Sequence, residues 1–302
     1  MPRLIAAETD RVASLEELID HCDRPGFDPL DEDCLAEAGP VLRALSNNRH
    51  FLCDLAIDEL KRRCATQIAG NDYSAQVIML RPPAGRYFLR ANFWPSHKDQ
   101  VLRSSGLAPF FYGIAHDHAF NFLTVGYLGP GYWSNYYEYD GAACVGHDGE
   151  AVPLRFTGTR RLEEGSVMLY RAHRDIHEQL PADALSVSLN IMGVAPDQAW
   201  RRQYLFDLTR GAIDQCMTTT SAEILLGLSV GLDDGNAVDL AQDFAAHHPS
   251  DAMRLSAWEA LGERTAGDAR LAHHDAGLSS SSPLIRNASR QACLQARPGG
   301  GR

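Results

Sequence analysis

The sequence lacks the features that mark several protein classes. Its seven cysteines are scattered without any C-x-x-C pair, which argues against a zinc knuckle or a redox motif and predicts reduced thiols. No apolar run reaches the roughly 18 residues that a membrane-spanning helix needs. Met1-Pro2-Arg3 is not followed by the long apolar stretch of a signal peptide. We therefore expect a cytoplasmic protein without a membrane partner.

Positive charge is also scarce. Lys and Arg total 28 against 39 Asp and Glu, and the net charge of −11 argues against nucleic acid as the main partner. The apolar share of 45% and the charged share of 22% are typical of a soluble globular protein. A small molecule is the partner that this composition favours.

Hydrophobic spacing divides the chain into three parts. From Ser14 to about Thr66, apolar residues recur at spacings of three and four, which predicts two or three helices. From Ser74 to Pro196 the period is two, and short apolar runs alternate with turn residues, as in a small antiparallel barrel or jelly roll. Helical spacing then returns. The predicted regions are an N-terminal helical region (1–70), a barrel (71–197) and an all-helical region with a disordered tail (198–302).

The C-terminal part contains a weak internal repeat. Residues 252–261 align with residues 284–293 at an offset of 32 residues, which resembles a pair of HEAT-like helical repeats. Two copies are too few for a free-standing solenoid. We expect these helices to pack on each other and on the barrel, or on a second subunit in a homodimer.

Two histidine motifs predict a metal site. His116 and His118 are two residues apart, so on a strand both imidazoles project from one face and can share one ion, while Asp117 points the other way. The segment that begins at Gly165 supplies a strand, a turn and then His177. Three imidazoles on one side of an ion leave other coordination positions open.

These motifs resemble those of the cupin superfamily. The first cupin motif contains G…H-x-H, and the second begins with Gly and ends with His about eleven residues later. His177 follows Gly165 by 12 residues and His173 follows it by eight, so His177 is the better third ligand and His173 is expected behind the ligands or at the surface. Many cupins place a ligating Glu shortly after H-x-H, where this chain has residues 122–124, Phe-Leu-Thr. The resemblance therefore implies a three-histidine site.

This ligand set is similar to that of the thiol dioxygenases. These cupins hold Fe(II) with three neutral histidines and add both oxygen atoms of O2 to a cysteine-like sulfur. Ser188 stands at the family's serine, Asn190 where the family usually has histidine, and Met192 where many members have the active-site tyrosine. The resemblance implies a non-haem Fe(II) dioxygenase and assigns Ser188 and Asn190 to substrate binding. Zn(II), Mn(II) and Ni(II) are the alternative ions.

The predicted substrate is a small amino-acid-like or thiol compound. Three neutral imidazoles leave the ion cationic and open, which suits an anionic substrate beside O2. Arg90 and Asn92 share one face of a predicted strand, where the guanidinium could bind a substrate carboxylate. The stretch 127–140 is rich in aromatic residues, and Tyr127 or Tyr137 is the predicted proton donor.

Other functions fit the same barrel. A metal-dependent lyase or isomerase would use its ion as a Lewis acid and need no O2. A ligand-sensing cupin would bind its ligand tightly without turnover. A 2-oxoglutarate oxygenase is less favoured, because its H-x-D motif could be drawn only from His173 and Asp175, and its third ligand from His247 or His248 in a helical segment.

Overall fold

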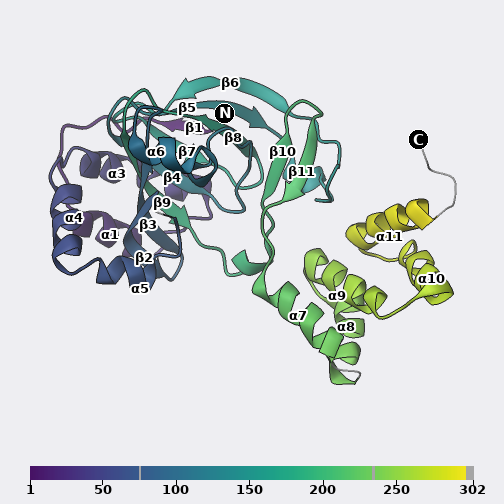
Figure 1. Cartoon of the computed structure of the whole chain (residues 1–302). Helices are drawn as coiled ribbons and strands as arrows, with labels where there is room; N and C mark the ends of the chain where they lie inside the picture. Colours follow the sequence, from purple (N-terminus) through teal and green to yellow (C-terminus); the bar gives the residue numbers. More distant parts are fainter. Residues whose placement is uncertain (75, 233–234, 297–302) are drawn as a thin grey trace. The chain divides into compact units, whose positions relative to one another are not determined.

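The computed structural model describes residues 1–74, 76–232 and 235–296 (Figure 1). The chain divides into two compact units. The first unit contains most of the chain up to Gln198, and most of the second follows Ala212. The predicted disordered tail at 297–302 lies outside the described residues. Within the described residues, no helix is both long enough and apolar enough to cross a membrane.

Short helices occupy the N-terminal part of the first unit. Helix α1 begins at a capping box, in which the Glu17 backbone N–H donates to Ser14 Oγ and the Ser14 backbone N–H donates to the Glu17 carboxylate. The helices of this unit are α1 (Leu15–Asp23), α2 (Glu32–Ala36), α3 (Gly39–Ser46), α4 (Phe51–Lys61), α5 (Ala65–Gly70) and α6 (Gln100–Ser105).

Two antiparallel sheets form the core of the first unit. The larger sheet has the strand order β1-β7-β4-β9-β3-β2, and the smaller has the order β6-β5-β8. The strands of these two sheets are β1 (Arg3–Ile5), β2 (Val77–Ala84), β3 (Tyr87–Trp94), β4 (Phe122–Leu128), β5 (Trp133–Glu138), β6 (Arg155–Arg161), β7 (Val167–Tyr170), β8 (Asp175–Leu180) and β9 (Ser186–Gly193). The predicted antiparallel β core with flanking helices is confirmed, and its assignment to the cupins stays a prediction.

Both faces of the larger sheet are buried, and they differ in character. Leu89, Leu123 and Leu189 point to one face, where they join a hydrophobic cluster with residues of α1 to α4. Residues of the opposite parity, such as Phe122 and Met192, point to the inner face and pack with Tyr136 of the smaller sheet. The inner face therefore lies against the smaller sheet, and side chains on it are shielded from water.

Helices make up most of the second unit. Leu226 and Val230 of α7 pack with Ala241 of α8 and with Met253 and Ala257 of α9 in a small apolar core. The helices are α7 (Ser221–Leu232), α8 (Asn236–His247), α9 (Asp251–Glu263), α10 (Gly267–Gly277) and α11 (Pro283–Ala296). The two aligned sequence segments fall in α9 and α11, and the HEAT-like repeat stays a prediction.

The prediction that strands end at Pro196 is wrong. Strands β10 (Tyr204–Asp207) and β11 (Ala212–Cys216) form a two-stranded sheet before the first C-terminal helix. The turn between them includes Gly211 at a φ of +63°. Strands of four and five residues are too short for their period of two to stand out against the helical spacing that follows.

A buried ion pair fixes the end of the smaller sheet. Arg171 donates to Glu138, the last residue of β5, and to Asp175, the first residue of β8. Burial raises the pKa of Glu138, but hydrogen bonds from the terminal amino group and from Arg171 outweigh this effect and lower the pKa to about 2. The ionised carboxylate therefore stabilises the folded state.

We expect Glu138→Gln to lower the free energy of unfolding near neutral pH. Because the folded pKa lies below the ordinary value of 4.5, the carboxylate's contribution is fully present above that value and is lost as the pH falls toward 2. Urea unfolding at pH 7, 4 and 3 should show the difference between variant and wild type shrinking in that order. A difference that stays constant with pH would contradict this role.

Candidate metal site

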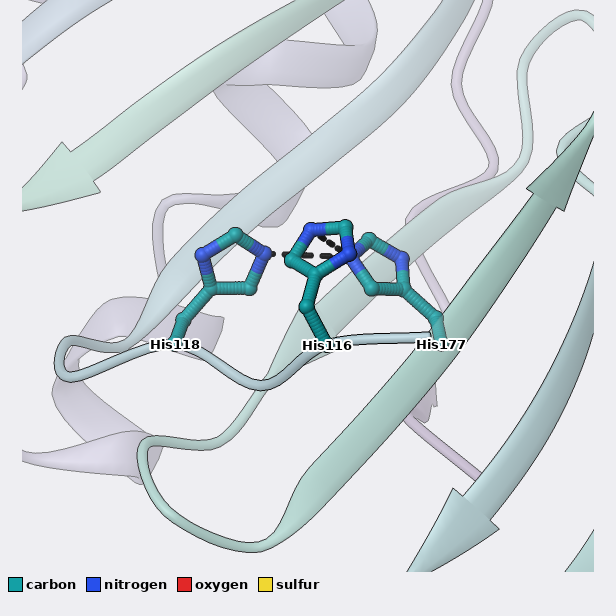
Figure 2. A group of neighbouring side chains, drawn as sticks. All are labelled: His116, His118 and His177. Carbon is teal, nitrogen blue, oxygen red and sulfur yellow. Dashed lines mark hydrogen bonds between the residues drawn. The ribbon is translucent and has the colours of Figure 1, made fainter. Parts of the chain in front are cut away.

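Three imidazoles meet in the space beside the inner face of the larger sheet. His177 comes from β8, and His116 and His118 come from the extended segment before β4 (Figure 2). His177 Nε2 lies 3.0 Å from His118 Nε2 and 3.2 Å from His116 Nε2. His116 and His177 are buried, and His118 is half-buried. The structure thus brings together all three histidines that the sequence predicts as ligands.

The local backbone explains this convergence. His116 and His177 form an isolated antiparallel bridge, in which each backbone N–H donates to the carbonyl of the other at 3.1 and 3.0 Å. Directly opposed residues of such a bridge place their side chains on the same side. His118 is two residues further along an extended chain, so its ring returns to that side as well.

The spacing of the nitrogen atoms fits one metal ion. Ligand nitrogens about 2.0–2.1 Å from an ion are about 2.9 Å apart at adjacent octahedral positions and about 3.4 Å apart in a tetrahedron. The two contacts of His177 Nε2, 3.0 and 3.2 Å, fall within this range. These Nε2 atoms are therefore the ones that would hold the ion.

All three imidazoles are held in the neutral form that a metal requires. Burial lowers the pKa of His116, and burial together with the neighbouring imidazoles lowers the pKa of His118 and His177 well below its usual value. His116 Nδ1 lies 2.9 Å from the Ile114 carbonyl oxygen, a contact that only an N–H can make. This contact leaves the Nε2 lone pair of His116 directed toward the other two rings.

Asp117 anchors the same segment from the opposite side. Its fully buried carboxylate accepts a hydrogen bond from Tyr139 Oη at 2.6 Å and lies 3.1 Å from His173 Nδ1. The His173 backbone N–H donates to the His118 carbonyl at 2.9 Å, with His173 at a φ of +52°. His173 therefore supports the segment that carries the imidazoles and does not join them.

The four predicted substrate-binding residues lie on one face. Arg90 and Asn92 of β3 pair in register with Asn190 and Ser188 of β9, and their parity places them on the inner face. Asn190 Nδ2 donates to Asn92 Oδ1 at 3.3 Å. Ser188 Oγ accepts a hydrogen bond from the indole N–H of Trp94 at 3.0 Å.

Arg90 lacks an acidic partner among the described residues. Its guanidinium lies over the Tyr73 ring, 4.8 Å from the centroid, and its Nε atom has no hydrogen-bond partner within the described chain. Burial lowers the pKa of Arg90. Burial is the main cause that lowers the pKa of His116 and His118, and the positive charge of Arg90 lowers both values further. Arg90 is therefore close enough to act on these two imidazoles.

Two other arginines of the first unit, Arg81 and Arg171, have carboxylate partners. Arg81 Nη1 lies 2.8 Å from Asp23 Oδ1 and contacts the Tyr87 hydroxyl, and Arg171 binds Asp175 and Glu138. An arginine that already neutralises a carboxylate is a poor site for a second anion. Among these three, Arg90 is the one suited to an anionic ligand.

The predicted proton donors lie away from the three imidazoles. Tyr127 belongs to the hydrophobic cluster on the helix-covered face, where its hydroxyl donates to the Asn48 carbonyl at 3.0 Å. Tyr137 packs against Phe156, with ring centroids 5.2 Å apart, on the outer face of the smaller sheet. The structure does not bring either phenol together with the histidines.

Three other tyrosines occupy the inner space. Tyr136 pairs in register with His177, so both side chains point inward. The Tyr136 and Tyr170 hydroxyls are 2.9 Å apart, and the Tyr170 ring lies 4.9 Å from the His177 ring. Burial raises the pKa of Tyr132, Tyr136 and Tyr170, so all three phenols are protonated near neutral pH. The register between β5 and β8 is the signal that distinguishes Tyr136 from Tyr137.

No family model and no curated protein matches the sequence. Among solved structures, hydroquinone 1,2-dioxygenase from Sphingomonas sp. TTNP3 with 4-hydroxybenzoate bound has a TM-score of 0.28 and 10% identity, over 43% of this chain and 71% of that chain. The DMSP lyase DddQ from Ruegeria pomeroyi DSS-3 has a TM-score of 0.26 and 9% identity, over 65% of this chain and 78% of that chain. Likenesses with TM-scores this low carry no conclusion about this chain.

We expect His177→Ala to abolish binding of a divalent ion, because it removes the nitrogen that lies next to both other imidazoles. The matched control is His173→Ala, which should largely retain the ion because its ring does not join the group. Metal analysis after dialysis, together with Zn(II) titration, measures both variants. Loss of metal from His173→Ala with retention in His177→Ala would contradict the assignment.

Proposed function

We propose that the protein is a non-haem Fe(II)-dependent cupin oxygenase, similar to the thiol dioxygenases, that oxidises a small amino-acid-like or thiol substrate with O2. The observation that carries this proposal is the group of three neutral imidazoles, which contains no carboxylate within the described part of the chain. An ion held by neutral ligands alone keeps its full positive charge and leaves positions for exogenous ligands. Iron(II), when bound, supplies the ability to activate O2 beside a coordinated substrate.

The charge of the surroundings supports an anionic substrate. A divalent ion at the three imidazoles and the guanidinium of Arg90 would place two cations in a space shielded from water. Among the described residues no acidic side chain pairs with Arg90, so this charge is not balanced within that part of the protein. A substrate carboxylate would neutralise the guanidinium through charge-assisted hydrogen bonds.

The other inner-face residues would orient such a substrate. Asn190 lies directly opposite Arg90 in the register of β3 and β9, and Ser188 lies opposite Asn92. In this proposal their amide and hydroxyl groups would contact the polar atoms beside the carboxylate. The Tyr170 ring lies 4.9 Å from the His177 ring, and its hydroxyl lies 2.9 Å from that of Tyr136, so this pair of phenols could supply or accept a proton beside His177.

We expect Arg90→Ala to raise the KM for the substrate roughly ten- to a hundredfold while the iron content is unchanged. A partly desolvated guanidinium–carboxylate pair contributes on the order of 1.5–3 kcal/mol, and this contribution would be lost. The matched control is Arg81→Ala, which removes an arginine whose partner is Asp23 on the helix-covered side. Equal KM values for Arg90→Ala and wild type would exclude Arg90 as the anchor.

A metal-dependent lyase or isomerase is the second candidate. The observation that favours it is the pair of protonated phenols beside His177, because proton transfer to or from carbon needs a positioned acid or base. A ligand-sensing protein without turnover is the third reading of the same site. Dependence on O2 separates the first candidate from the other two.

We expect iron-loaded protein to consume O2 only when a suitable amino acid or thiol is present. An oxygen electrode screen over amino acids and small thiols, with product analysis by mass spectrometry, makes this measurement. The His177→Ala protein is the control for free iron. Turnover at full rate without oxygen would replace the oxygenase proposal by the lyase or isomerase.

A further inference from the structure

A fourth side chain reaches the same point as the three imidazoles. Gln179 lies two residues beyond His177 on β8, so both side chains project from the same face of the strand. Gln179 is buried, and its amide nitrogen Nε2 lies 3.3 Å from His177 Nε2. Its amide oxygen Oε1 has no hydrogen-bond partner among the described residues. No hydrogen bond of Oε1 therefore fixes which way round the amide group lies.

The amide end of Gln179 lies about as close to His177 Nε2 as the other two imidazoles do. This atom has neighbours at 3.0 Å on His118, 3.2 Å on His116 and 3.3 Å on Gln179. All three values match the separation of about 2.9–3.4 Å expected between ligand atoms that share one ion. The amide end of Gln179 therefore lies where a further ligand atom would lie.

The chemistry of the amide decides which of its atoms faces the ion. An N–H group directed at His177 Nε2 would occupy the lone pair that the ion needs. A half-turn about the terminal bond exchanges nitrogen and oxygen without moving the rest of the side chain. The oxygen then offers a lone pair to the ion, and it adds no charge to the three neutral imidazoles.

We propose that Gln179 is a fourth protein ligand, and that it binds the ion through its amide oxygen. The site would then hold a metal by three nitrogen atoms and one neutral oxygen atom, with two positions of an octahedron open for exogenous ligands. This assignment concerns metal binding alone, so it holds or fails independently of the proposed reaction.

The test uses metal ions without substrate or O2. Zn(II) dissociation constants are measured by competition with a chelator for wild type, Gln179→Met and Gln179→Glu, and Co(II) absorption spectra are recorded for each. The methionine variant keeps the length and packing of the side chain but lacks the amide. The matched control is Glu178→Gln, whose side chain accepts a hydrogen bond from Asn135 on the other face of β8.

We expect Gln179→Met to weaken Zn(II) binding by about tenfold or more and to change the Co(II) spectrum, because a ligand is lost. Gln179→Glu should bind at least as tightly as wild type, since a carboxylate oxygen replaces the amide oxygen. Glu178→Gln should match wild type. An unchanged dissociation constant and spectrum in Gln179→Met would overturn the proposal, as would weaker binding by Gln179→Glu than by Gln179→Met.

Discussion

Two reciprocal backbone hydrogen bonds between His116 and His177 determine how the metal site is assembled. They join the extended segment before β4 to strand β8 at a single antiparallel bridge. The bridge sets the two imidazoles side by side, with ring centroids 4.5 Å apart, and the period of two brings His118 to the same side. Asp117 holds the segment from its other face through Tyr139.

The second constraint is the shielding of this space from water. The inner face of the larger sheet and the smaller sheet enclose imidazoles and phenols that burial keeps uncharged, and beside them lies the guanidinium of Arg90. A divalent ion at the imidazoles would add positive charge to this space. Among the described residues no acidic side chain pairs with Arg90, and this is the reason for proposing a carboxylate-bearing ligand.

The sequence was sufficient to predict features that depend on spacing along one strand. The period of two identified most strands of the larger sheet, the convergence of His116 and His118, and the shared face of Arg90 and Asn92. Each of these follows from the alternation of side chains on a single extended segment. The same alternation applied to His177 puts Gln179 on its face of β8.

Features that depend on the register between distant segments could not be predicted from the spacing along one strand. Tyr136 and Tyr137 are adjacent, and which of them faces the imidazoles depends on the pairing of β5 with β8. A shift of one residue in that pairing would exchange the two. Strands β10 and β11 were missed for another reason, because each is too short to show a period.

X-ray absorption spectroscopy of the iron-loaded protein tests the central claim most directly, since it detects the atoms around the ion without any assumption about the reaction. We predict nitrogen and oxygen scatterers at about 2.0–2.2 Å, with outer-shell scattering that corresponds to three imidazole rings. The imidazole signal should disappear in His177→Ala protein incubated with the same iron concentration. A spectrum of the wild-type protein without imidazole scattering would contradict the account.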